Sequence, residues 1–334
     1  MEKLLEIKNL ETAFRIKDDY FNAVDKVSLD LYRNEVLAIV GESGCGKSTL
    51  ATTIMRLHNE NLTKSTGEII FNGKNILDLT EDEMNKIRTK DIGMIFQDPL
   101  SSLNPLHRIG KQIEEALIYH TELSAEERQK RVIELLTQVG IPNPERCARQ
   151  YPHELSGGMR QRVMIAMAMS CKPSVLIADE PTTALDVTIQ AQILDLIKGL
   201  QAEMHAGIIL ITHDLGVVAE MADRVAVLYA GEVVEIGTAE QIFKNPQHPY
   251  TRSLLRSIPQ LDDEDASDEL YVIQGMVPSL KTLDRQGCRF ADRIPWVKDE
   301  HHEHNPTLHE VEEGHHVRCT CYRNFEFEGE ENNA

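Results

Sequence analysis

The sequence has few aromatic residues and few positive charges. Aromatic residues make up 5% of the 334 residues, and 35 Lys and Arg stand against 54 Asp and Glu, a formal net charge of −19. Nucleic-acid binding needs clustered basic side chains to neutralise phosphates, so this balance argues against a nucleic-acid partner. The hydrophobic content of 41% is ordinary for a globular protein that buries a core.

Long apolar runs and a disulfide framework are also missing. No apolar stretch approaches the roughly 20 residues that span a bilayer. The start, MEKLLEIKNLETAF, carries charges throughout, unlike a signal peptide. The six cysteines are irregularly spaced, three in the body and three in the tail. We therefore expect a chain of a reducing, cytoplasmic compartment that reaches a membrane only through a partner.

Short apolar segments alternate with helical patterns over the first two-thirds of the chain, which predicts an α/β fold with a mainly parallel sheet. The candidate buried strands lie at 35–40, 91–96, 175–178 and 207–212. The stretch 98–172 has helical spacing and begins one helix with a capping box, Ser124 to Glu127, so we interpret it as an inserted helical subdomain. Residues 224–235 predict a strand pair joined by a tight turn.

The character of the sequence changes near residue 259. We divide the chain there into a main domain, 1–258, and a small C-terminal extension, 259–334. The extension opens with an acidic run, 261–269, which we expect to be a solvated linker. A segment rich in Cys and His follows, and the last residues, 325–334, have a composition for which we expect disorder at the very end.

A glycine-rich segment at 41–48, GESGCGKS, matches the phosphate-binding pattern G-x-x-x-x-G-K-[ST] between a predicted strand and a predicted helix. Such a loop turns several N–H groups toward phosphate oxygens at the positive end of the helix. Lys47 can reach the β- and γ-phosphates, and the hydroxyl of Ser48 can ligate Mg²⁺. The residues predicted to contact the nucleotide here are Gly41, Ser43, Gly44, Cys45, Gly46, Lys47, Ser48 and Thr49.

Two acidic residues follow the apolar strand at 175–178. Asp179 and Glu180 stand at its carboxyl end, where open α/β sheets bind ligands. Asp179 suits a water-mediated Mg²⁺ contact, and Glu180 suits the role of general base on the attacking water.

A second glycine-rich helix start lies at 155–161, LSGGMRQ, and includes Ser156, Gly157, Gly158 and Gln161. Its N–H groups offer another phosphate site. Since one nucleotide does not need two such cradles from one chain, we expect two subunits facing head to tail, each loop paired with the partner's second cradle.

In order along the chain, these motifs resemble the ATP-binding-cassette family. The series is the loop at Gly41, then Gln97, 155–161, Asp179 with Glu180, 184–186, and His213 after a strand. The resemblance implies an ATPase with a P-loop, RecA-like core and an antiparallel β subdomain. It implies that Gln97 senses Mg²⁺ and the attacking water, that His213 contacts the γ-phosphate, and that Asp186 acts across the dimer interface.

The same resemblance implies an aromatic ring against adenine. Tyr20 is our candidate, with Phe21 or plain core packing as the alternatives. With Lys47, the residues Gln97, Glu180 and His213 form the predicted catalytic set, and Ser48, Gln97 and Asp179 the predicted Mg²⁺ set.

The segments 97–105 and 245–251 look like the peptide and nickel branch of importers, and 158–168 and 186–193 look like its D-type subunits. This implies ATP-driven import of oligopeptides or dipeptides by a peripheral protein on the cytoplasmic face of the membrane. The implied partners are a related second ATPase subunit, two membrane permease subunits and an extracellular binding protein. An importer of nickel or another small solute is the alternative, and a soluble cassette ATPase is disfavoured by the single motif set.

The tail departs from the related subunits, which often carry four cysteines thought to hold an iron–sulfur cluster. Ile294 and His301 stand at two of the expected positions, and isoleucine cannot ligate iron. Cys288, His301, Cys319 and Cys321 offer a Cys₃His set that suits zinc or an atypical cluster. The alternative is a degenerate site with free thiols and surface histidines.

Overall fold

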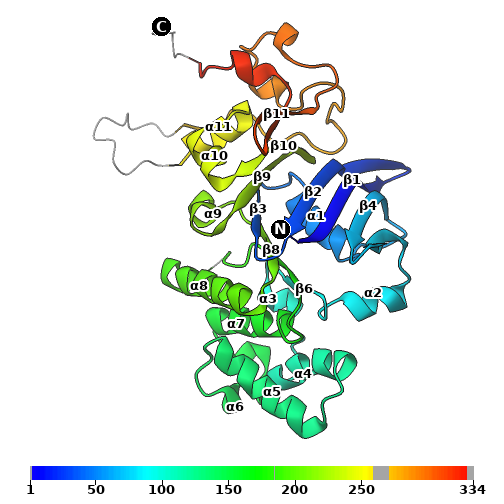
Figure 1. Cartoon of the computed structure of the whole chain (residues 1–334), viewed down its shortest axis with the longest axis vertical. Coiled ribbons are helices and arrows are strands. Elements are labelled where there is room, and N and C mark those ends of the chain that lie inside the picture. Colours follow the sequence, from blue (N-terminus) through cyan, green and yellow to red (C-terminus); the bar gives the residue numbers. More distant parts are fainter. Residues whose placement is uncertain (1, 184, 259–270, 329–334) are drawn as a thin grey trace.

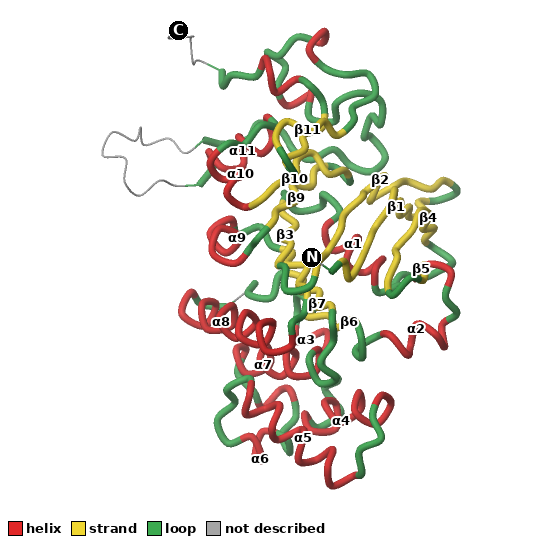
Figure 2. Tube along the Cα trace, in the orientation of Figure 1, coloured by secondary structure: helices red, strands yellow, loops and turns green. Residues whose placement is uncertain are grey.

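Two sheets and an all-helical lobe make up the molecule (Figures 1 and 2). The computed structural model describes residues 2–183, 185–258 and 271–328. The acidic run at 261–269, the last residues 329–334 and Ala184 lie outside the described residues, so the expectations about them stay predictions.

The larger sheet has eight strands in the order β11-β12-β10-β9-β3-β8-β7-β6. Its parallel part joins β9, β3, β8, β7 and β6, and the strands β3, β6, β7 and β8 are buried along their whole length. Helices on both faces explain such continuous apolar strands. The parallel strands are β3 (Val36–Val40), β6 (Ile92–Ile95), β7 (Val175–Asp179), β8 (Gly207–Ile211) and β9 (Arg224–Tyr229).

The smaller sheet is antiparallel, in the order β2-β1-β4-β5. Helix α1 (Lys47–Ile54) lies between the two sheets, and its Leu50 and Ile54 belong to a core that also contains Ile7 and Ile209. The strands are β1 (Lys3–Ile16), β2 (Asp19–Tyr32), β4 (Thr63–Phe71) and β5 (Lys74–Asn75). This sheet and the parallel core confirm the predicted α/β class with an antiparallel β subdomain.

Helices α3 to α7 all lie between β6 and β7 in the chain and form the lower lobe in Figure 1. The predicted capping box at Ser124 and Glu127 is present, and Val132, Leu135 and Leu136 face the lobe's core. The helices are α3 (Pro99–Ser102), α4 (Ile109–His120), α5 (Ala125–Gln138), α6 (Pro144–Cys147) and α7 (Gly157–Ala168). The inserted helical subdomain is therefore present.

The C-terminal extension joins the core sheet. Strand β12 (His315–Arg318) pairs with β10 (Glu232–Thr238), and β11 (Leu308–Glu312) pairs with β12. The ring of Phe290 packs against Tyr229 and Tyr250 of the main domain, so this part of the extension shares a core with the main domain. The boundary at residue 258 stays a prediction.

The remaining helices cover the flanks of the two sheets. They are α2 (Glu81–Ile87), α8 (Val187–Met204), α9 (Leu215–Met221), α10 (Ala239–Lys244) and α11 (Pro249–Arg256). Within the described ranges, no helix combines the length and the apolar character that crossing a membrane requires.

Candidate active site

The loop between β3 and α1 curls tightly because two of its glycines touch neighbouring backbone. A Cβ on Gly41 would lie 2.2 Å from the carbonyl oxygen of Leu228, and one on Gly46 would lie 2.4 Å from that of Ala23. Gly46 also has φ +108, a conformation that side chains rarely adopt. The main chain can therefore form the phosphate cradle only with glycine at these positions.

Lys47 is buried at the start of α1. Its Nζ donates to the carbonyl oxygens of Gly41 at 2.7 Å and Glu42 at 3.0 Å, so the ammonium lies inside the curve of the loop. Burial raises the pKa of the neighbouring Cys45 thiol. The buried thiol of Cys45 lies 3.8 Å from Nζ of Lys47 and packs in the core.

Ser48 and Asp179 come together across α1 and β7. The hydroxyl of Ser48 donates to Oδ1 of Asp179 at 3.0 Å. Burial raises the pKa of this carboxyl group, and Ser48 and Lys47 oppose that shift. Hydroxyl, carboxylate and water oxygens are the ligands that Mg²⁺ prefers, so the pair fits the predicted metal.

Glu180 is the centre of a polar cluster. Its Oε2 accepts hydrogen bonds from Nε2 of Gln97 at 2.8 Å and from the hydroxyl of Thr183 at 2.9 Å, and its Oε1 lies 3.2 Å from Nδ1 of His213. Burial raises the pKa of Glu180, but Thr183, His213 and Lys47 outweigh this and lower it. Glu180 also has φ +46, a strained conformation of the kind found at functional sites.

The strand order explains this convergence. Gln97 comes soon after β6, Glu180 directly after β7, and His213 soon after β8, and these three strands are parallel neighbours. Their carboxyl ends therefore lie at one edge of the sheet. The structure brings the predicted set together, and the catalytic roles of its members stay predictions.

The second cradle opens α7, where the hydroxyl of Ser156 accepts a hydrogen bond from the amide of Met159. Gly157 and Gly158 form the first turn, and Gln161 donates to the carbonyl oxygen of Pro181 at 2.6 Å, which ties the helix to the segment after Glu180. In the part of the chain that the structure describes, no hydrogen bond or ion pair joins residues 156–161 to the phosphate loop. The expectation that a partner subunit uses this cradle stays a prediction.

Two further candidates have structural contacts of their own. Asp186 is the N-cap of α8 and accepts a hydrogen bond from the amide of Ile189 at 3.0 Å. The ring of Tyr20, on β2, has the ammonium of Lys64 4.1 Å from its centroid. Their proposed roles at the dimer interface and against adenine stay predictions.

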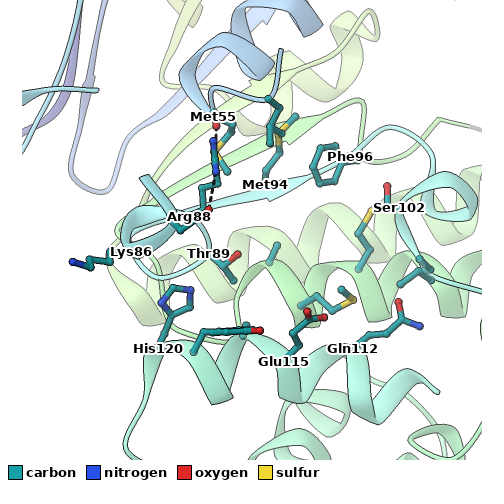
Figure 3. A pocket seen from close by; sticks show the side chains of 18 residues that line it. Met55, Lys86, Arg88, Thr89, Met94, Phe96, Ser102, Gln112, Glu115 and His120 are labelled. Atoms are coloured by element: carbon teal, nitrogen blue, oxygen red, sulfur yellow. Dashed lines mark hydrogen bonds between the residues drawn. The ribbon is translucent and has the colours of Figure 1, made fainter. Parts of the chain in front are cut away.

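A cleft of about 700 Å³ opens between the parallel sheet and the helical lobe, next to β6 (Figure 3). Met94 and Phe96 lie on one side of it, and Gln112 and Glu115 of α4 on the other. Phe96, which lines the cleft, directly precedes Gln97, which binds Glu180. The cleft and the Glu180 cluster are therefore neighbours.

Three supporting residues were not among the predicted site residues, although one of them, Tyr250, lies in the segment 245–251. Tyr250 and Arg293 both hold Glu42 of the phosphate loop: the Glu42 amide donates to the tyrosine hydroxyl at 2.8 Å, and the guanidinium pairs with the carboxylate at 2.6 Å. Thr183 could have been suspected from its place beside Glu180. Arg293 lies 251 positions from Glu42, and no local pattern marks it.

The structure corrects the histidine of the proposed metal set. His302, rather than His301, joins Cys288, Cys319 and Cys321, with all four ligand atoms within 4.8 Å of one another. His301 ends a 3₁₀ turn (Asp299–His301), and its Nε2 lies 3.9 Å from Oε1 of Glu300. His302 follows in extended backbone. Of the two adjacent histidines, it is therefore His302 whose ring nitrogen lies beside the cysteines.

Fold and site together define a P-loop ATPase of the cassette type, with a helical lobe inserted between two core strands. A family model described as "ABC transporter" matches residues 24–183, and one described as "Oligopeptide/dipeptide transporter, C-terminal region" matches residues 234–300. The oligopeptide transport ATP-binding protein OppD of Lactococcus lactis subsp. cremoris (strain SK11) is 54% identical over 98% of this chain and 96% of its own length. The dipeptide transport ATP-binding protein DppD of Bacillus subtilis (strain 168) is 53% identical over 88% of each chain.

Solved structures agree with this assignment. The dimeric post-hydrolysis state of the ATP-binding cassette MJ0796, bound to ADP and Pi, has a TM-score of 0.64 and 33% identity, covering 71% of this chain and 99% of that one. This chain belongs to the ABC transporter family, among its ATP-binding subunits.

Proposed function

We propose that this chain binds and hydrolyses ATP to power a membrane importer of oligopeptides or dipeptides. The observation that carries the proposal is the 54% identity to an oligopeptide transport ATP-binding protein over nearly the full length of both chains. It includes the C-terminal region, where the oligopeptide/dipeptide model matches.

Glu180 is the proposed general base. Its lowered pKa keeps the carboxylate ionised at neutral pH, so it can accept a proton from the attacking water. Gln97 and His213 hold its two oxygens, which fixes the direction in which the carboxylate faces. Mg²⁺, when bound, neutralises phosphate charge, and Ser48 with Asp179 are the residues proposed to hold it.

The Met-rich cleft beside β6 supports a permease partner. Met55, Met94, Met164 and Met167 line it, and flexible methionine surfaces suit the burial of a partner's apolar side chains. Movement of a segment seated there would act on Phe96 and through it on Gln97. We accordingly propose two permease subunits, a related second ATPase and an extracellular binding protein as partners, with this chain on the cytoplasmic face of the membrane.

The test is transport by the assembled complex in proteoliposomes. We expect ATP-dependent uptake of a dipeptide or a longer peptide, and peptide-stimulated ATP hydrolysis. Uptake of Ni²⁺ with no response to peptides would contradict the cargo while leaving the ATPase assignment intact. An isolated chain that hydrolyses ATP but binds no permease would contradict the importer as a whole.

A further inference from the structure

The tail holds a compact cluster of four metal-ligating side chains. The sulfur atoms of Cys288, Cys319 and Cys321 and a ring nitrogen of His302 all lie within 4.8 Å of one another. Cys319 and Cys321 are buried, and the other two residues are partly buried. The four come from three separate segments, so tertiary structure brings them together.

The imidazole of His302 lies against the thiol of Cys319 without a hydrogen bond of normal geometry to explain its place. Within the described residues, both of its ring nitrogens are buried and lack a hydrogen-bond partner. Buried polar atoms are normally paired, and an orphaned nitrogen requires a cause. A metal ion among the sulfurs supplies one, because neutral imidazole is a common metal ligand.

The backbone around the sulfurs is also arranged to hold them. The amide of Glu303 donates to Sγ of Cys319 at 3.4 Å, an outer contact of the kind that orients metal ligands. Cys319 has φ +65, a strained conformation for a residue with a side chain. The amide of Gly287 donates to the carbonyl oxygen of His304 at 2.9 Å, which joins the loop bearing Cys288 to the segment bearing His302.

The four-cysteine iron–sulfur cluster that the family resemblance implies does not fit this donor set. In a four-iron cluster each ligand binds a different iron atom, so the ligand atoms must surround a whole cluster rather than one ion. Here they converge within 4.8 Å, and one of them is a nitrogen. A single tetrahedral zinc ion, with Zn–S bonds of about 2.3 Å, needs sulfurs about 3.8 Å apart, which this cluster reaches with small movements.

We propose that Cys288, His302, Cys319 and Cys321 bind one zinc ion in a closed Cys₃His site, in place of an iron–sulfur cluster. Four protein ligands leave no open position for a substrate, so the ion is structural.

The site fastens the tail to the phosphate loop. Arg289 and Arg293 follow Cys288 closely: the first pairs with Asp25 and Glu232, and the second pairs with Glu42 of the loop. Cys319 follows β12, which is part of the core sheet. By binding Cys288 and Cys319 together, the ion would connect the segment that contacts Glu42 to the segment that follows β12 of the core sheet.

The test begins with the full wild-type chain, purified without oxygen and without added metal. We expect elemental analysis to find about one zinc per chain, with no iron and no acid-labile sulfide. Exchange for Co²⁺ should give the intense visible absorption of tetrahedral cobalt bound by thiolates. Iron with labile sulfide would overturn the proposal in favour of a cluster, and a folded chain without metal would overturn it outright.

Adjacent histidines supply the matched control. His302→Ala should lose most of its zinc to a chelator that leaves wild type loaded, whereas His301→Ala and Cys171→Ser should behave as wild type. His302→Cys, which restores a fourth ligand, should retain zinc. Its retention would show that zinc loss from His302→Ala reflects the missing ligand and not misfolding. Equal zinc retention by His302→Ala and His301→Ala, or loss from His302→Cys, would contradict the ligand set.

Discussion

The side-chain amide of Gln97 donates a hydrogen bond of 2.8 Å to Glu180, across 83 positions of the sequence. Gln97 stands at the junction between β6 and the helical lobe, and Glu180 directly follows β7. Any movement of the lobe that draws Gln97 away therefore removes one of the two hydrogen bonds to Oε2 of the proposed base and leaves the one from Thr183.

The first prediction concerns the proposed base. Glu180→Gln should bind ATP as wild type does, because the phosphate loop is untouched, and should lose hydrolysis by about 100-fold or more. Nucleotide affinity and turnover in the assembled complex measure the two effects. Glu126→Gln, on the exposed first turn of α5, is the control. Full turnover by Glu180→Gln would disprove its role.

The second prediction separates binding from chemistry. Lys47→Ala should weaken nucleotide binding itself, because the ammonium lies inside the curve of the phosphate loop. Equilibrium binding of a fluorescent ATP analogue measures this. Unchanged affinity combined with lost turnover would assign Lys47 to the chemical step alone.

The third prediction concerns assembly. A cysteine at Ser156 should crosslink to one in the phosphate loop of the related ATPase subunit in the ATP-bound state, because the second cradle faces a partner's loop in the proposed dimer. A cysteine at Ser124, at the start of α5 in the helical lobe, is the control. Efficient crosslinking without nucleotide would contradict this arrangement.

The fourth prediction concerns a buried ion pair. The side chain of Arg289 is 3% exposed and pairs with Asp25 and Glu232. Arg289→Ala leaves both carboxylates without that partner, and we expect a loss of about 3–5 kcal/mol in unfolding free energy. Arg323→Ala, exposed in the same tail, should change it little. Urea denaturation compares the two variants.

The fifth prediction is a pH dependence. Burial raises the pKa of Asp25, but the hydrogen bond and charge of Arg289 and the charge of Arg285 outweigh it, and the pKa lies below its ordinary value. A lowered folded-state pKa adds stability above the unfolded value, about 3.9, and that stability is lost as the pH falls through the folded value. Asp25→Asn should therefore lose stability at neutral pH and show a shallower decline below about pH 4. Identical acid profiles for variant and wild type would contradict the role of the pair.

Much of the fold and of the nucleotide site could be predicted, because the relevant signals are local. Glycines at 41 and 46, the capping residues Ser124 and Ser156, and apolar runs that end in acidic residues each depend on neighbours within a few positions. Gln97 and His213 were assigned to the site only through the family resemblance, and the parallel order of β6, β7 and β8 is the physical reason that they meet Glu180.

Only the tertiary structure decided how the tail meets the core. The sequence by itself determined that the tail holds three cysteines and several histidines that could form a metal site. The fold after the 3₁₀ turn at Asp299–His301 decides that His302, and not His301, lies beside the three sulfurs. The sequence likewise did not indicate that β12 pairs with β10 of the core sheet or that Arg293 forms an ion pair with Glu42. Such contacts join residues far apart in the chain, and their energy comes from burial and charge pairing that exist only once the packed molecule has formed.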